Sequence, residues 1–277
     1  RVREETETGS RPDISQVPNI KLGLFSVKDG LVNYRDETSG RFEVVSNLNG
    51  SLSWPSTRTS WRFSGNGIWR GDTVDVRLDA LTPVMLLAGG QSDVTAEIKS
   101  EPLTLSFKGE ANRFADLFFS GELNATSPSL RRTINFLGGE AGSGSSFSDF
   151  SAGGSISGTL KDMQIQEASL ELDGNAYSGS LRLSSTEDDL NRLSGTLAAE
   201  AIDASPYMQQ IGSVEGIRSL FTILDGSEMD VRLSSKTVKL NDLAVSDFAG
   251  SLISRDREFK IDVGNANVGE GIIVGKL

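Results

Sequence analysis

The chain contains no cysteine and no histidine among its 277 residues. Without thiols and imidazoles, disulfide bonds, cysteine nucleophiles, histidine general bases and the usual zinc sites are all excluded. Acidic pairs such as Asp72 and Asp75 fall in turns or at polar strand positions, where solvated carboxylates are expected. We therefore expect no catalytic residue, no metal ligand and no cofactor, and we expect that the protein is not an enzyme.

Positive charge is also in short supply. The chain has 27 lysines and arginines against 38 aspartates and glutamates, which gives a formal net charge of −11. Phosphate backbones and anionic lipid surfaces would be repelled by this charge. The sequence therefore predicts no nucleic-acid partner and no electrostatic docking onto a membrane surface.

Long hydrophobic runs are missing as well. No apolar run approaches the roughly 20 residues that a spanning helix needs. The chain starts on the polar stretch "RVREET" without an initiator methionine or a signal peptide, and "GEGIIVGKL" stops within a strand-like pattern. We expect the chain to be a fragment of a longer protein, with its last module truncated at the C-terminus.

What the sequence does contain is alternation of apolar and polar residues with period two, as in Val74, Val76 and Leu78. This period is typical of strands with one apolar face, and it predicts about 15 to 18 of them. Asp29-Gly30 predicts a turn, and a change of phase predicts a bulge near Glu167. The expected fold is mainly β: a long curved antiparallel meander sheet of repeating β-groove type with a few short covering helices.

The alternation is interrupted three times by a serine or threonine followed by proline. These interruptions predict short helices near residues 83–89, 128–137 and 206–221. Helices of this kind would cover the places where strand edges or the apolar face are exposed.

The middle helix has the clearest signals. Ser127 is expected as its N-cap and Pro128 as its first residue. The side chains expected to press on the sheet are Leu130, Ile134 and Leu137. Arg131 and Arg132 would then point outward, where they could contact a lipid headgroup or a protein partner. The Gly/Ser-rich stretch at 138–154 would act as a tether on which the helix swings as a gate.

Composition also suggests how the chain is divided. Residues 1–16 are expected to be a polar tail, followed by a first β-meander module at 17–139. A Gly/Ser-rich linker or loop at 140–153 would lead into a second module at 154–277.

A sheet with one apolar face must cover that face. It can pack on a second sheet, close on itself, or leave a groove for an apolar ligand, and alternation alone does not choose among these. If a groove is left, the side chains expected to line it are Leu52, Trp54, Trp61, Phe63, Trp69, Val76, Leu105, Phe107, Phe119, Leu123, Leu181, Leu183 and Leu197.

Two stretches of the first half resemble the AsmA family of Gram-negative envelope proteins. "LGLFSVKDGLVNYRDETSGRFEVVSNLNGSLSWP" resembles the family's apolar–Asp-Gly–apolar strand pair and the Leu-rich strand that follows it. "GELNATSPSLRRTINFLGG" resembles the short helix after such strands in rhizobial-type members.

The second half resembles the family's C-terminal region. "ASLELDGNAYSGSLRLSS" and "LNDLAVSDFAGSLISRDREFKIDVGNANVGEGIIVGKL" match strand pairs closed by Gly-x-Leu, at Gly179–Leu181 and Gly275–Leu277. The resemblance covers most of residues 18–277.

The resemblance implies a periplasmic domain attached to the inner membrane by one N-terminal anchor helix that lies outside this chain. Family members are similar to bridge-type lipid transporters, so phospholipid acyl chains would be the ligands. The implied function is phospholipid transport between the inner and outer membranes and outer-membrane assembly. The alternative is a β-sandwich adhesion or carbohydrate-binding module, which the cluster of Trp54, Trp61 and Trp69 would also suit.

Overall fold

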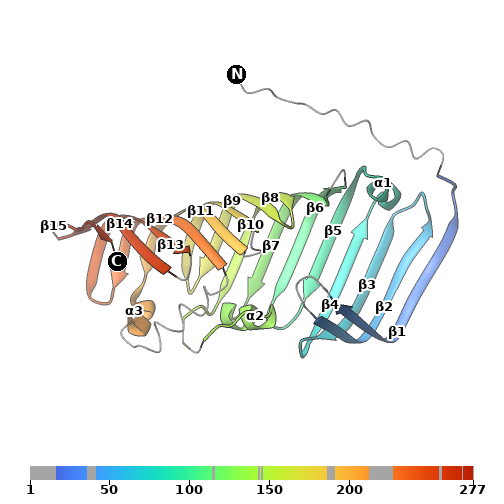
Figure 1. Cartoon of the computed structure of the whole chain (residues 1–277), viewed down its shortest axis with the longest axis horizontal. Coiled ribbons are helices and arrows are strands. Elements are labelled where there is room, and N and C mark those ends of the chain that lie inside the picture. The colour runs from blue at the N-terminus through green and yellow to red at the C-terminus, as the bar shows by residue number, and fades with distance from the viewer. Residues whose placement is uncertain are drawn as a thin grey trace, which may run out of the picture.

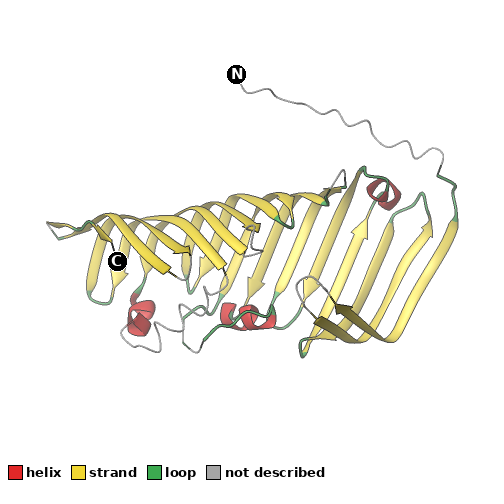
Figure 2. Cartoon of the chain, in the orientation of Figure 1, coloured by secondary structure: helices red, strands yellow, loops and turns green. Residues whose placement is uncertain are grey.

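The protein folds into one long, twisted sheet (Figure 1). The structure is a computed structural model. It describes residues 17–35, 42–113, 116–142, 144, 146–185, 191–211, 227–255, 258–269 and 271–276. Strands make up most of this part of the chain, and short helices lie along the margins of the sheet (Figure 2).

The sheet has 16 strands, and almost every strand lies beside the one that precedes it in the sequence. The strands are β1 (Lys21–Arg35), β2 (Phe42–Ser56), β3 (Trp61–Trp69), β4 (Asp72–Ala80), β5 (Gln91–Lys99), β6 (Thr104–Asn112), β7 (Phe118–Ser127), β8 (Phe150–Thr159), β9 (Asp162–Leu172), β10 (Asn175–Ser185), β11 (Asn191–Asp203), β12 (Ser227–Leu240), β13 (Leu243–Arg255), β14 (Glu258–Val268), β15 (Gly271–Ile272) and β16 (Gly275–Lys276). The last two short strands both pair with β14. The expected mainly-β meander is therefore confirmed.

One pair departs from the antiparallel pattern. β11 and β12 run parallel, from Asn191 opposite Ser227 to Asp203 opposite Lys239. Parallel neighbours need a long crossover connection, and residues 204–226 supply it. Period-two alternation carries no information on strand direction, so the sequence did not reveal this pair.

Three short helices are described: α1 (Pro83–Leu87), α2 (Leu130–Phe136) and α3 (Ser205–Ile211). All three predicted helices are confirmed in position, although the part of the third that was expected at 212–221 lies outside the described residues. α1 sits at one long edge of the sheet, and α2 and α3 sit at the opposite edge (Figure 1). None of the described helices has the length and hydrophobicity needed to cross a bilayer.

The turn predicted at Asp29-Gly30 is wrong. β1 continues through this site, where a register shift marks a bulge and Asp29 has a φ of 50°. The amide of Asp29 donates to Oδ1 of Asn49 at 3.0 Å, which satisfies the bulged residue within the sheet. The bulge predicted near Glu167 is confirmed, with a φ of 49° at that residue and register shifts on both sides of β9.

The Gly/Ser-rich segment joins two strands that pair with each other along their whole length. β8 begins at Phe150, inside the expected linker at 140–153, and Phe150 lies opposite Ser127 of β7. The sheet therefore continues without a break across this segment.

Candidate functional site

Strand register brings apolar side chains from the whole molecule onto one face of the sheet. A single cross-strand row runs through Trp61, Ala80, Val94, Gly109, Gly121, Ile156, Ile165, Leu181, Gly195 and Val231. We call the side of the sheet that carries this row the apolar face, and the other side the polar face. All 13 predicted groove residues lie on the apolar face, because each is in register with this row or an even number of residues from it.

The polar face carries the charges. Arg62 pairs with Asp79 across β3 and β4, with Nε 2.6 Å from the carboxylate. Similar cross-strand ion pairs join Arg77 to Glu97, Arg182 to Asp162 and Lys236 to Glu200. Exposed pairs of this kind add little stability, but they keep this face hydrated. The two faces of one sheet thus differ sharply in polarity.

Side chains on the apolar face are partly hidden although the described residues form one layer. Val94, Phe107 and Ile156 are only 8%, 7% and 4% exposed, and they form one cluster with neighbours such as Trp61 and Phe119. No second sheet packs against the face within the described part of the chain. Neighbouring side chains of the same face cover these residues, together with Leu86 of α1.

Aromatic rings lie over glycines on this face. A Cβ built on Gly109 would meet Cζ of Phe107 at 2.9 Å, and one on Gly65 would meet Cζ of Phe63 at 3.0 Å. Because glycine has no side chain, the ring two residues away covers the bare backbone. The sequence signal was an aromatic residue, any residue, and then glycine, and it recurs at Phe63-Gly65, Phe107-Gly109, Phe119-Gly121, Tyr177-Gly179 and Phe248-Gly250. Period-two alternation did not predict this pairing of ring and glycine.

The helices border the apolar face at its two long edges. Leu86 of α1 packs against the cluster around Val94. At the opposite edge, the ring of Phe136 in α2 meets Trp69 edge to face, with centroids 4.8 Å apart. The helices therefore contribute to the rims of the face, as expected of covering elements, and they leave its centre open.

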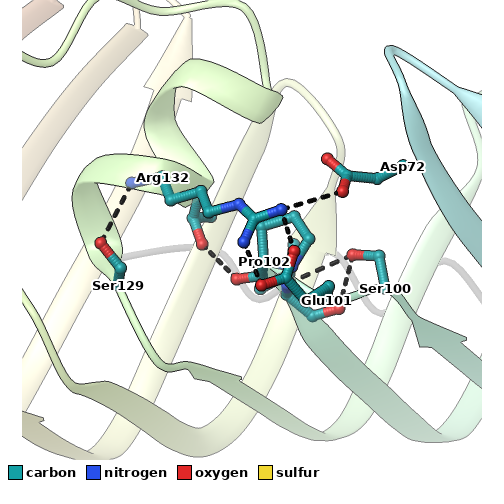
Figure 3. A network of polar contacts seen from close by, with 8 residues as sticks. Asp72, Ser100, Glu101, Pro102, Ser129 and Arg132 are labelled. Carbon is teal, nitrogen blue, oxygen red and sulfur yellow. Dashed lines mark hydrogen bonds and ion pairs between the residues drawn. The ribbon is translucent and has the colours of Figure 1, made fainter.

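α2 is held to the sheet by polar contacts to two turns (Figure 3). Arg132 pairs with Asp72 at the start of β4 and with Glu101 in the β5–β6 turn. Thr133 Oγ1 donates to the backbone oxygen of Pro102 at 2.5 Å. Arg132, predicted as a headgroup or partner contact, is exposed but already engaged by these two carboxylates.

The predicted start of α2 is wrong by two residues. Ser129 is the N-cap, and its hydroxyl accepts from the amide of Arg132 at 3.3 Å. Ser127 is instead the last residue of β7, and its buried hydroxyl accepts from the amide of Ser129 at 3.0 Å. Pro128 lies between strand and cap. Ser127 pairs with Phe150 of β8, so β7 extends through the predicted cap position.

The predicted inner face of α2 is wrong in part. The buried residues of the helix are Arg131, Thr133 and Phe136; of the predicted residues, Leu130 and Ile134 are half-buried and Leu137 is 49% exposed. Arg131 does not point outward. Its Nε donates to the backbone oxygen of Ser146 at 2.7 Å, its Nη1 donates to that of Gly142, and its guanidinium stacks over Phe147. Backbone carbonyls that need donors draw the arginine inward, which an apolar-stripe rule does not anticipate.

The Gly/Ser-rich segment is anchored at its far end by Asp173, in the β9–β10 turn. The Asp173 carboxylate accepts from the amides of Phe147 and Ser148, both at 2.7 Å, and from the Ser148 hydroxyl at 2.6 Å. Tyr207 of α3 donates its hydroxyl to the same carboxylate at 2.6 Å. These contacts tie the end of the segment to α3 and to a hairpin turn, and the swinging gate stays a prediction.

Electrostatics agree with this anchoring. Burial by itself raises the pKa of Asp173, but the hydrogen bonds from Ser148, Tyr207 and the Phe147 amide outweigh it and hold the pKa below its usual value. Burial raises the pKa of Tyr207, and the hydrogen bond to Asp173 raises it further. The carboxylate is therefore charged and the phenol neutral at neutral pH.

The polar face offers shallower candidates. One hollow of about 450 Å³ is bordered by polar-face residues such as Thr196, Arg232 and Asp262. Another, of about 490 Å³, lies near Ser64 and Arg77. No cluster of three or more carboxylates that could hold a metal ion occurs among the described residues. The second hollow holds the ion pairs that Glu97 makes with Arg77 and Lys99. The apolar face extends over far more strands than either hollow, so it is the stronger candidate site.

Comparison with known proteins gives no relative: the chain matches no protein-family model, no curated protein and no solved structure.

Proposed function

We propose that this chain is the periplasmic β-groove domain of an AsmA-like protein, in which the apolar face holds phospholipid acyl chains. The observation that carries the proposal is the continuous apolar face, which spans the sheet without a second layer of described residues over it. The AsmA-like sequence patterns supply the proposed setting: attachment to the inner membrane and transport of phospholipid between the two membranes.

The energetics favour an acyl ligand. Exposing two chains of about 15 methylenes each costs roughly 24 kcal/mol at about 0.8 kcal/mol per methylene, so a free lipid crosses water very slowly. Fourteen strand spacings of about 4.8 Å give the face a length of roughly 67 Å. A face of this length offers continuous apolar contact along its whole path, and the charged polar face remains in water. Such a role needs no catalytic residue.

The test uses a phospholipid with a photoreactive acyl chain. We expect the purified chain to crosslink to this lipid through residues of the apolar face and to retain lipid in a native mass spectrum. Leu183→Asp should abolish crosslinking at its position, and because Leu183 is already 43% exposed, the variant should stay folded. Leu105→Asp tests the middle of the first half of the face in the same way.

Ser157→Asp is the matched control, since Ser157 is exposed on the polar face beside the buried Ile156. It adds the same charge and should leave crosslinking unchanged. Equal crosslinking by Leu183→Asp and Ser157→Asp would refute the proposal. Retention of an oligosaccharide in place of lipid would support the adhesion or carbohydrate-binding alternative.

A further inference from the structure

The first strand of the sheet, β1, has a free edge. It pairs with β2 on one side, and no strand of the described residues lies on its other side, so the backbone groups along that side of a 15-residue strand are left for a further strand. At the other end of the sheet, β15 and β16 already pair with β14. Natural proteins keep free edges short or covered, because a long apolar edge pairs with another chain.

Exposed leucines lie on the polar face of β1. Leu24 is on this face because it is opposite Ser53 of β2. Leu31 directly precedes Val32 of the apolar face, so it belongs to the polar one as well. The two leucines are 71% and 64% exposed. The polar face of β4, by contrast, carries Thr73, Asp75, Arg77 and Asp79. A neighbouring strand that covered the leucines of β1 would remove apolar surface from water.

The bulge at Asp29 makes β1 complementary to a second copy of itself. Before the bulge the apolar-face residues of β1 have odd numbers, and after it they have even numbers. Two antiparallel copies aligned about the bulge therefore match apolar face with apolar face on both sides of it. Phe25 then lies opposite Val32 of the second copy, and both side chains are exposed in the single chain. On the polar face, Ser26 lies opposite Leu31 of the second copy.

Charge favours the same alignment. It places Lys28 opposite Asp29 of the second copy, and the two-fold symmetry repeats this contact, so two ion pairs lie at the centre of the interface. A shift by one residue would set Lys28 opposite itself and Lys21 opposite Arg35, and it would also set apolar-face residues opposite polar-face ones. Both charge and face parity therefore select the alignment about the bulge.

We propose that β1 pairs antiparallel with β1 of a second copy of this chain and joins the two sheets into one. The two-fold axis is perpendicular to the sheet, because the matched faces keep both apolar faces on the same side. The paired segment, residues 22–35, spans roughly 46 Å at about 3.3 Å per residue. The dimer doubles the length of the apolar face without covering it. This inference goes beyond the proposed function and needs no lipid ligand.

Because the chain has no cysteine, disulfide formation can test the register directly. In the double variant Phe25→Cys/Val32→Cys, each new thiol lies opposite a thiol of the second copy, with Cα atoms about 4.5–5.5 Å apart, which suits a disulfide. Within one chain the two positions are roughly 23 Å apart along β1, so no internal disulfide can form. We expect a disulfide-linked dimer under mild oxidation. The matched control is Ser26→Cys/Val32→Cys, which puts the thiols on opposite faces and should link about tenfold more slowly or less.

Analytical ultracentrifugation tests the association itself. The wild-type chain, with a mass of 29.7 kDa, should sediment as a dimer at micromolar concentration. Lys28→Glu sets two carboxylates opposite each other twice and should raise the dimer dissociation constant about tenfold or more. Lys161→Glu is the matched control, since Lys161 is equally exposed but lies in the β8–β9 turn, far from β1 in the strand order. Circular dichroism checks that each variant keeps the wild-type strand signal.

Two results would overturn the dimer. The first is a wild-type chain that stays monomeric up to about 100 µM, where even a weak specific pair would associate. The second is a dimer in which both cysteine variants link equally and Lys28→Glu acts no more strongly than Lys161→Glu, because another surface would then hold the copies together. A monomer that still crosslinks to the photoreactive lipid would refute the dimer and leave the proposed function standing.

Discussion

Substitution of Asp173 should be the most direct way to detach the Gly/Ser-rich segment from the edge of the sheet. Its carboxylate accepts four hydrogen bonds, from the amides of Phe147 and Ser148, the Ser148 hydroxyl and the Tyr207 hydroxyl. In Asp173→Asn one oxygen is replaced by an NH₂ group that faces donors. Hydrogen bonds to charged groups contribute about 1.5–3 kcal/mol each, so the loss of two should cost about 3 to 6 kcal/mol.

The loss should be local, because the strand ladders do not depend on this carboxylate. Hydrogen exchange measures it directly. The amides of Phe147 and Ser148 should exchange about 100-fold faster or more, at about 1.4 kcal/mol per tenfold, while those of β6 and β7 keep their rates. The matched control is Asp149→Asn, which removes the same charge from an exposed neighbour.

The same carboxylate gives a pH dependence with a defined sign. The pKa of Asp173 in the folded protein is held below its usual value, and the value in an unfolded chain is about 3.9. Its stabilisation is therefore complete well above pH 4 and is lost as pH falls through the lower, folded pKa. The stability difference between wild type and Asp173→Asn should shrink below pH 4. Equal exchange rates in Asp173→Asn and Asp149→Asn at neutral pH would refute this account.

Four further substitutions test the packing by urea denaturation. Gly109→Ala should lower the free energy of unfolding by about 1–3 kcal/mol or more, since its Cβ would lie 2.2 Å from the backbone oxygen of Ser120. A smaller loss of stability would mean that β6 and β7 separate easily at this position. Ser129→Ala should cost about 1 kcal/mol through the lost N-cap, and no change would contradict the assigned helix start. Arg131→Met should cost about 3 kcal/mol, because it leaves buried backbone carbonyls without a donor. Arg132→Gln is the control at an exposed ion pair and should cost less than about 1 kcal/mol. Similar losses in the two variants would mean that Arg131 is not buried.

Alternation of period two was enough to predict a mainly-β chain and to place all 13 groove candidates on one face. This success has a simple cause: successive side chains of a strand point to opposite sides, so parity along each strand fixes the face. The helix positions followed for a similar reason, because serine or threonine, proline and glycine act locally on the backbone.

Features that depend on a partner distant in the sequence were predicted less well. Asp29-Gly30 has the composition of a turn, but pairing with β2 and the side chain of Asn49 make it a bulge. Arg131 belongs to the outward side of an isolated amphipathic helix, but the carbonyls of Gly142 and Ser146 need its donors.

The sequence by itself determined which residues are strands, which side of each strand is apolar, and where the meander is interrupted, because these follow from the nearest few residues. Tertiary structure alone decided that β11 and β12 run parallel and that the Gly/Ser-rich segment is anchored at Asp173. Each of these depends on residues tens of positions apart, whose approach is set by the register and curvature of the whole sheet.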